Sequence, residues 1–311
     1  MATHGWCDIF LGFIARCQAN TPTDFCFSFR GFRERGGRTG RHVDGWGVAF
    51  FEGKGFRNFC DSLPSALSPI ANLICNYPIK TRTVIAHVRM ATQGRVRLEN
   101  VHPFSRELWG SYWIFAHNGD VPSAKDAAKR AVFLKTKSKR YTPVGDTDSE
   151  AVFCFFLNRL LDAFPDAPPN MADVFVELKR VWQELCSESG VIFNFLLGQG
   201  GDTLFAGCWP GARPGSEVWN SLYYTVREFP FTTCQLVDDD CEVDFDTVTT
   251  PSDRVAVIAT APLTTNEVWC EMAKGDMLAF HGGQPFSSPD DFRRQLRTKV
   301  VDISVRSNAG A

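Results

Sequence analysis

The chain has 311 residues, of which 44% are hydrophobic and 22% charged, and its formal net charge is -2. This profile is typical of a globular protein with one large domain or two small ones. The balanced charge disfavours a nucleic-acid partner. The sequence contains neither a run of about 18 apolar residues nor a secretory signal pattern, so we expect a cytoplasmic protein with no membrane partner.

The cysteines and histidines limit the kinds of site that the chain can hold. The 11 cysteines are scattered without a CxxC pair, which argues against a disulfide framework and fits a reducing compartment. The six histidines form neither an HExxH motif nor a zinc-type cluster with cysteine. We therefore expect no metal and no cofactor.

Apolar and β-branched runs predict four strands in the first part of the chain, and Asn118-Gly119 is expected to close the fourth as a turn. These strands are expected at residues 7–15, 45–51, 83–89 and 113–117. Four further strands are expected at residues 191–197, 203–208, 222–227 and 255–260.

Two helices are predicted between these groups of strands. Thr147 and Glu150 have the spacing of a capping box, with Thr147 as N-cap and Glu150 reaching back to it, and Pro165 ends the helix. Asn170 is expected to cap a second, amphipathic helix that stops at Gly190. Strands, then two adjacent helices, then strands again argue against strict βαβ alternation and predict an α+β layered domain.

Two segments are expected to be peripheral. Residues 124–140 carry seven basic residues and one acidic residue, which is typical of a solvated loop or helix face. Residues 286–311 lack a clear core pattern and are interpreted as a C-terminal tail.

Polar clusters stand at the ends of predicted strands or at the predicted helix start. They are Cys7, His87–Gly94 with the following Asn100–Pro103, His117–Gly119 and Thr147–Glu150. Taken singly, each cluster has an ordinary structural interpretation: a core thiol, a surface ion pair, structural histidines, a turn or a helix cap.

Taken together, the clusters fit attack on the side-chain amide of a free amino acid. The planar fork of Arg89 suits an α-carboxylate, and Asp148 suits an α-ammonium group. Cys7 is the candidate thiolate nucleophile. The Asn118 side chain and the Gly119 N–H group can donate hydrogen bonds to the resulting oxyanion.

These motifs resemble those of the class II glutamine amidotransferases, which are N-terminal-nucleophile hydrolases. CDIFLGFIAR, AHVRMATQG, HNG and TDSE match the family in order and spacing. The resemblance is strongest to the small stand-alone branch, through PTDFCFSF, DGWGVAFFEG, ENVHPFSRELWG and ATAPLTTNEVW. The motifs span roughly residues 7 to 270, which is nearly the whole chain.

The resemblance implies a four-layer αββα sandwich and hydrolysis of a γ-glutamyl amide through a γ-glutamyl thioester. In this scheme Cys7 is the nucleophile and its own α-amino group is the base, whose usual pKa of about 7.7–8.0 suits that role. Arg89 would hold the substrate carboxylate and Asp148 its ammonium group. The remaining residues implied by the match are Asn118 and Gly119 in the oxyanion hole and Thr92 and His102 in the pocket lining.

The identity of the nucleophile has three open alternatives. Family members of this branch usually begin Met-Cys, whereas here residues 1–6 precede Cys7 and are interpreted as an extension or propeptide. The interval from Cys7 to Pro22 is also longer than in the family, and a gap-free match places Gly12 at the nucleophile position. The alternatives are therefore Cys7 after removal of residues 1–6, a protein without an N-terminal nucleophile, and Cys17.

The expected domain, residues 7–285, is compatible with more than one function. The leading hypothesis is an amidohydrolase acting on glutamine or a γ-glutamyl thiol metabolite, alone or with a partner subunit that accepts ammonia. The alternative is an inactive module that binds a γ-glutamyl ligand or regulates a partner. A different amide hydrolase with an N-terminal cysteine is disfavoured, because Arg89 and Asp148 suit a zwitterionic amino acid, and no cysteine carries a papain-like signature.

Overall fold

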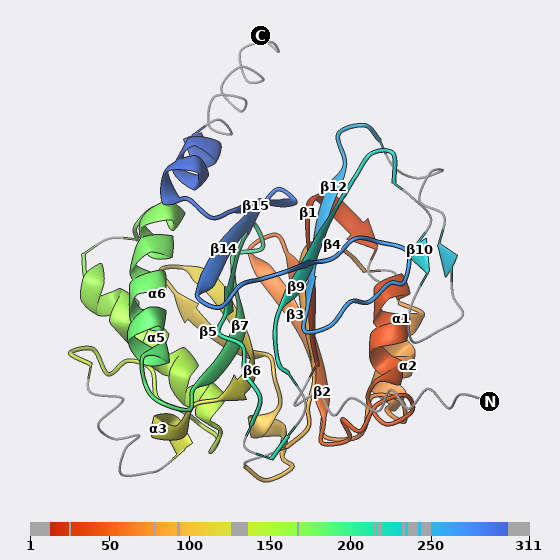
Figure 1. The fold of residues 1–311 in the computed structure, drawn as a ribbon, viewed down its shortest axis with the longest axis horizontal. Coiled ribbons are helices and arrows are strands. Elements are labelled where there is room, and N and C mark those ends of the chain that lie inside the picture. Colours follow the sequence, from red (N-terminus) through yellow and green to blue (C-terminus); the bar gives the residue numbers. More distant parts are fainter. Residues whose placement is uncertain are drawn as a thin grey trace.

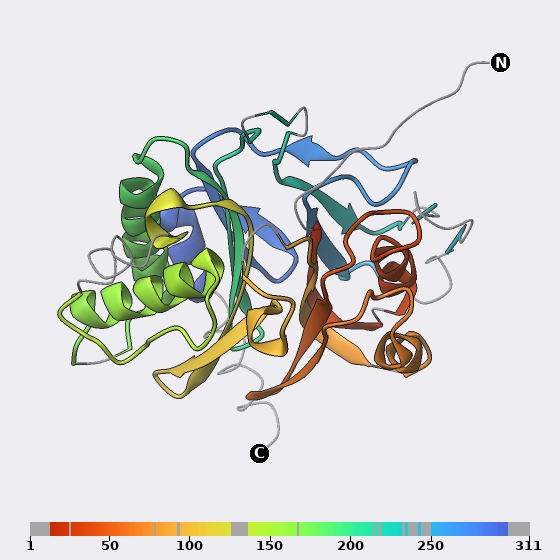
Figure 2. The same cartoon turned by 90° about the horizontal axis from the view of Figure 1, so that it is seen from below.

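The computed structural model describes residues 13–24, 26–77, 79–91, 94–125, 136–166, 168–213, 215–216, 219–231, 234–235, 242–243 and 250–297. Two antiparallel sheets lie face to face, and helices lie on the outer side of each sheet (Figures 1 and 2). This arrangement confirms the predicted α+β class. No helix among the described residues has the length and apolar character needed to cross a membrane.

The larger sheet has seven strands in the order β13-β9-β12-β1-β4-β2-β3. These strands are β1 (Phe13–Asp24), β2 (Trp46–Glu52), β3 (Gly55–Asp61), β4 (Lys80–Val88), β9 (Tyr223–Glu228), β12 (Arg254–Ala259) and β13 (Cys270–Glu271). Its outer face is covered by helices α1 (Cys26–Glu34) and α2 (Pro69–Cys75) (Figure 1). A separate short pair joins β10 (Cys234–Gln235) to β11 (Glu242–Val243).

The smaller sheet has six strands in the order β15-β14-β8-β7-β6-β5. These strands are β5 (Phe104–Leu108), β6 (Ser111–Asp120), β7 (Ile192–Gln199), β8 (Thr203–Cys208), β14 (Asp276–His281) and β15 (Gln284–Phe286). Helices α5 (Asp148–Ala163) and α6 (Met171–Cys186) cover its outer face (Figure 2). Two short helical turns, η1 (Leu98–Asn100) and α3 (Pro122–Lys125), lie in the connections.

Strand β6 shows how one segment contributes to two hydrophobic layers. Its side chains alternate between the faces of the sheet. Ile114 and Ala116 pack in the cluster between the two sheets, whereas Phe115 packs against the helices. The Phe115 ring stacks on that of Phe153 in α5 at 5.2 Å between centroids.

The structure corrects two predicted strand limits. β1 continues to Asp24, well beyond the predicted end at residue 15, because β4 supplies hydrogen bonds along the polar part of the strand. Residues 7–12 of that prediction lie outside the described residues. Asn118 and Gly119 do not form a turn, because they remain in β6 and pair with Asn194 and Phe193 of β7.

The predicted C-terminal tail is also partly wrong. Residues 289–297 are helical, and the side chain of Phe292 is completely buried beside Phe175 and Phe286. The described part of this segment therefore belongs to the core of the domain, and residues 298–311 lie outside the described residues. One buried aromatic side chain among polar neighbours is too weak a pattern to predict from sequence.

The described ends of the basic segment 124–140 are fixed to the surface by polar contacts. Lys125 forms an ion pair with Asp120, and Arg140 with Glu107 at 2.8 Å. The backbone N–H group of Lys137 donates to the Asp162 carboxylate at 2.9 Å. Residues 126–135 lie outside the described residues.

Candidate active site

A small cavity lies where strand β4, strand β6 and helix α5 come together. β4 ends at Val88 and β6 at Asp120, and α5 begins at Asp148. The cavity has a volume of about 40 Å³, which is room for a few water molecules. Its lining residues are His87, Arg89, Met90, Ala91, His102, His117, Gly119, Thr147, Asp148 and Ser149.

Arg89 directly follows β4 and is buried. Its guanidinium group donates to the backbone carbonyl oxygens of Asp44 at 3.4 Å and Arg95 at 3.3 Å. Burial lowers the pKa of Arg89, and three nearby carboxylates oppose that shift. These carboxylates belong to Asp44, Asp146 and Asp148. The side chain is therefore held as a cation at the edge of the cavity.

Two polar side chains outside the predicted site organise the loop that follows Arg89. The Asp44 carboxylate accepts a hydrogen bond from the N–H group of Ala91 at 2.7 Å. The Asn100 side chain donates to the Asp146 carboxylate at 2.6 Å and to the carbonyl oxygen of Arg95 at 3.0 Å. These contacts connect the loop to segments before β2 and before α5.

Asp148 is the first residue of helix α5 and is buried. Its carboxylate accepts from the backbone N–H groups of Val121 at 3.1 Å and Ser149 at 2.8 Å. A carboxylate is favoured at this position by the free N–H groups and the positive end of the helix.

The capping box predicted at this helix start is half correct. The Thr147 hydroxyl accepts from the N–H group of Glu150 at 3.2 Å, as predicted. The Glu150 carboxylate, however, accepts from the N–H groups of Val144 and Gly145 and pairs with Arg106 at 2.5 Å. Tertiary contacts with the preceding loop and with β5 compete successfully for this side chain.

Three buried histidines surround the cavity: His87, His102 and His117. Burial lowers the pKa of each, because the charged imidazolium would lose its hydration. The His87 and His102 rings lie 4.2 Å apart between centroids, and the His117 Nδ1 atom lies 2.9 Å from the Ser149 hydroxyl. The lining is therefore largely neutral around the Arg89 and Asp148 charges.

Gly119 occupies a position that excludes a side chain. Its φ angle is +150°, and a Cβ atom there would lie 1.9 Å from the carbonyl oxygen of Ile192. Asn118 is also buried, and strand alternation places its side chain on the opposite face of β6 from His117, toward the larger sheet.

The structure brings most of the described predicted residues together. Arg89, His102, Gly119 and Asp148 line one cavity, and Asn118 is adjacent to it in β6 without forming part of the lining. Cys7 and Thr92 lie outside the described residues. Cys17 lies within β1, where its backbone pairs with Val84 and Val257.

Other lining residues have no assigned role in the predicted site. His87 and His117 stand in the quoted motifs, but isolated histidines do not reveal their spatial proximity. Ser149, within TDSE, gave no signal beyond its place in the helix start. Within the described ranges, no cluster of three or more histidine, cysteine or acidic side chains has the geometry of a metal site.

Comparison with known proteins identifies the family of the chain. The family model for glutamine amidotransferases class-II matches residues 13–300. YafJ of Escherichia coli K12 is 45% identical over 86% of this chain and 96% of its own length. A Haemophilus influenzae relative named as a glutamine amidotransferase is 42% identical over 86% of this chain and 83% of its own length.

The solved structures include a similar protein at matching length. The crystal structure of a predicted glutamine amidotransferase from Pseudomonas aeruginosa PA01 has a TM-score of 0.65 and 38% sequence identity. The match covers 88% of this chain and 99% of that one. From the extent of these matches, the chain belongs to the class-II glutamine amidotransferases.

Proposed function

We propose that the protein is an amidohydrolase that cleaves a γ-glutamyl amide, either glutamine or a γ-glutamyl thiol metabolite. The observation that carries this proposal is the placement of buried Arg89 and Asp148 on one cavity. A cation and a nearby anion on the same small cavity complement the carboxylate and ammonium groups that a free amino acid carries on one carbon. We further infer that the two sheets with their outer helices are the four-layer αββα sandwich of N-terminal-nucleophile hydrolases.

In the proposed reaction, Arg89 binds the substrate α-carboxylate and Asp148 binds its α-ammonium group. The Cys7 thiol passes its proton to its own α-amino group, and the sulfur attacks the γ-carbonyl carbon. The Asn118 side chain and the Gly119 N–H group donate to the oxyanion. Collapse of this intermediate breaks the carbon–nitrogen bond, and the proton leaves with ammonia or the amine.

Water then hydrolyses the γ-glutamyl thioester, which releases glutamate and restores the thiol. Thr92 and His102 complete the proposed pocket lining. The ammonia is released to solvent or passes to a partner subunit. Ammonia released at one equivalent per glutamate by the isolated protein would indicate that hydrolysis needs no such partner.

The direction of β1 supports Cys7 as the nucleophile. The strand begins at Phe13, which pairs with Val88, the residue before Arg89. Cys7 precedes Phe13 by six residues, and six residues span at most about 20 Å. Cys7 is therefore within reach of the cavity. Its use as an N-terminal nucleophile requires removal of residues 1–6, so that its α-amino group is free.

The first experiment is the intact mass and N-terminal sequence of the purified protein, before and after treatment with 6-diazo-5-oxo-L-norleucine, a cysteine-directed glutamine analogue. We expect a chain that begins at Cys7 and carries one adduct on that residue. Cys7→Ala should carry none, whereas Cys270→Ala, which removes an exposed free thiol, should still carry it.

A chain that keeps residues 1–6 and forms no adduct would contradict the amidohydrolase. If that chain still bound glutamine, and Arg89→Ala abolished the binding, we would conclude that the protein is the inactive binding module.

A further inference from the structure

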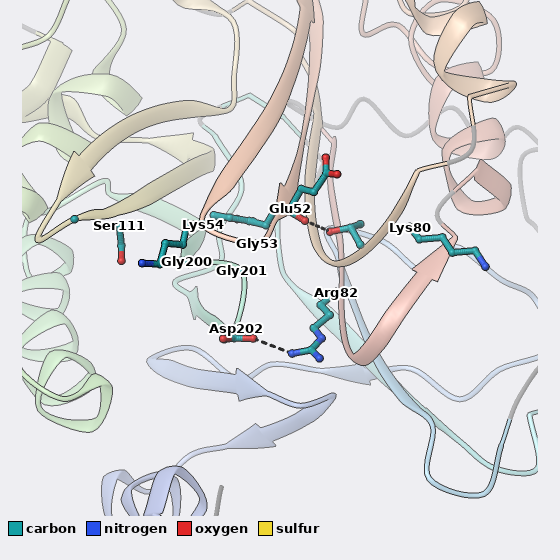
Figure 3. A pocket seen from close by; sticks show the side chains of 12 residues that line it. Glu52, Gly53, Lys54, Lys80, Arg82, Ser111, Gly200, Gly201 and Asp202 are labelled. Atoms are coloured by element: carbon teal, nitrogen blue, oxygen red, sulfur yellow. Dashed lines mark hydrogen bonds and ion pairs between the residues drawn. The ribbon is translucent and has the colours of Figure 1, made fainter. Parts of the chain in front are cut away.

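A second, larger cavity lies at the end of the two sheets remote from the candidate active site. Its volume is about 570 Å³, within the range of small-molecule sites. It is lined by the β2–β3, β5–β6 and β7–β8 turns and by the first residues of β4 (Figure 3). No part of the proposed reaction uses these residues.

Strands β4 and β6 separate the two cavities. β4 runs from Lys80 at the larger cavity to Val88 beside Arg89, and β6 runs from Ser111 to Asp120. A strand of this length extends about 30 Å at 3.3 Å per residue. The larger cavity is therefore a separate site.

Buried hydrogen bonds hold the walls of this cavity in place. The Thr81 hydroxyl donates to the carbonyl oxygen of Phe51 at 2.6 Å, which ties the end of β2 to β4. The Thr83 hydroxyl donates to the carbonyl oxygen of Gly201, which ties the β7–β8 turn of the smaller sheet to β4 of the larger one. The cavity is therefore preformed by both sheets.

The charges that line the cavity leave an excess of cations. The lining includes Lys54, Lys80 and Arg82 but only two carboxylates, and that of Glu52 is paired at 2.7 Å with Arg57, outside the lining. The other carboxylate, Asp202, lies 3.5 Å from Arg82, with the side chains 59% and 47% exposed. Exposed pairs of this kind are weak and easily exchanged.

Lys54 adds uncompensated charge to this site. It forms no ion pair with another described residue. Figure 3 shows Lys54 pointing toward Ser111 and Arg82 reaching the Asp202 carboxylate, whereas Lys80 points away from them. Lys54, Ser111 and Arg82 thus present donors from three different walls.

We propose that this cavity binds a small molecule through a phosphate group. Arg82 exchanges its contact with Asp202 for two phosphate oxygens, Lys54 supplies a second positive charge, and the Ser111 hydroxyl donates to a third oxygen. Donors on several walls suit a tetrahedral anion, whereas a planar carboxylate is already satisfied by a single arginine fork. The volume leaves room for an organic group attached to the phosphate.

The test is calorimetric titration with inorganic pyrophosphate at fixed ionic strength. Arg82→Met and Lys54→Met should each weaken binding about tenfold, the loss expected for one charge-assisted contact. Asp202→Asn should strengthen binding, because it removes the carboxylate that competes for Arg82. Lys137→Met, which removes an exposed lysine beside the end of α5, is the matched control and should change affinity less than twofold.

Three results would overturn the proposal: no saturable binding of pyrophosphate, an equal loss in Lys137→Met, or citrate binding as tightly as pyrophosphate. Equally tight binding of citrate would show that the site recognises negative charge and not phosphate. The substituted side chains are solvent-exposed, and unchanged melting temperatures would verify that the variants fold. If Arg82→Met failed to fold, Lys54→Met alone would decide the question. Binding is measured without turnover, so the result is independent of the amidohydrolase assignment.

Discussion

At the scale of single residues, the candidate site depends on one buried cation. Arg89 contacts backbone carbonyl oxygens of two loops and lies among three carboxylates, which together compensate its burial. Such an arrangement keeps a guanidinium group charged and fixed before a ligand arrives. A lysine could not reproduce it, because its ammonium group lacks the planar fork.

Removing this cation should affect substrate binding strongly. We expect Arg89→Ala to lower kcat/KM for glutamine about 100-fold or more, mainly through KM, because the substrate carboxylate loses a buried charged partner. Steady-state kinetics with glutamine measures this. Arg97→Ala, in the same loop with an exposed side chain 3.7 Å from Glu99, should change little. Unaltered glutamine turnover in Arg89→Ala would rule out the amino-acid assignment.

The buried histidines should make the fold sensitive to acid. Burial lowers the pKa of His87, His102 and His117, whereas unfolded histidine has a pKa of about 6.5. Between these values the unfolded state binds protons that the native state does not, so the free energy of unfolding falls as the pH drops below about 6.5. Each histidine contributes up to about 1.4 kcal/mol per pH unit.

This pH dependence can be measured by urea denaturation between pH 7.5 and pH 5. His102→Gln removes one titrating group and should make the slope of unfolding free energy against pH shallower by up to one proton. A slope identical to that of the unsubstituted protein would show that His102 titrates alike in both states.

At the scale of secondary-structure elements, the start of α5 joins stability to the site. Thr147 caps the helix, and the next residue is Asp148. The same kind of cap begins α6, where the Asn170 side chain accepts from the N–H group of Asp173 at 3.0 Å. The two caps have the same chemistry, but of these two only Thr147 lines the cavity.

Because Thr147 lines the cavity and Asn170 does not, substituting each cap distinguishes an effect on helix stability from an effect on substrate binding. Thr147→Ala and Asn170→Ala should each lower the free energy of unfolding by about 1 kcal/mol, since each leaves a helix N–H group without its cap. Thr147→Ala should also raise KM for glutamine, whereas Asn170→Ala should not. Urea denaturation and steady-state kinetics measure the two effects. A similar rise in KM in both variants would indicate a general loss of stability instead.

At the scale of the whole molecule, the layer between the two sheets holds the site strands in register. β4 and β6 belong to different sheets, and the cavity requires both of their ends. Apolar side chains from both sheets fill this layer, including Ile85 of β4, Ile114 of β6 and Leu196 of β7.

A substitution that leaves a void in this layer should therefore lower the free energy of unfolding. Leu196→Ala should lower the free energy of unfolding by about 2–5 kcal/mol, since Leu196 is completely buried. Leu67→Ala, where the side chain is 73% exposed, should change it by less than about 0.5 kcal/mol. Denaturant titration compares the two, and equal effects would show that the layer between the sheets does not limit stability.

By itself, the sequence determined the elements that have strong local patterns. The apolar run of β2, the capped helices α5 and α6 and the hairpin of β7 and β8 follow from neighbouring residues alone. The order of the motifs also identified Arg89, Gly119 and Asp148 as candidates, because each stands at the end of an element. The family resemblance of these motifs can be recognised from the sequence without coordinates.

Only the tertiary structure decided which groups meet. Asn118-Gly119 reads locally as a turn, but pairing with β7, more than 70 residues later in the chain, keeps it in a strand. The Glu150 carboxylate pairs with Arg106 and does not complete the predicted capping box. The side chain of Phe292 is buried in the core, where it packs against Phe175 of α6. The physical reason is the same in each case: a partner distant in the sequence offers more hydrogen bonding or burial than the local alternative.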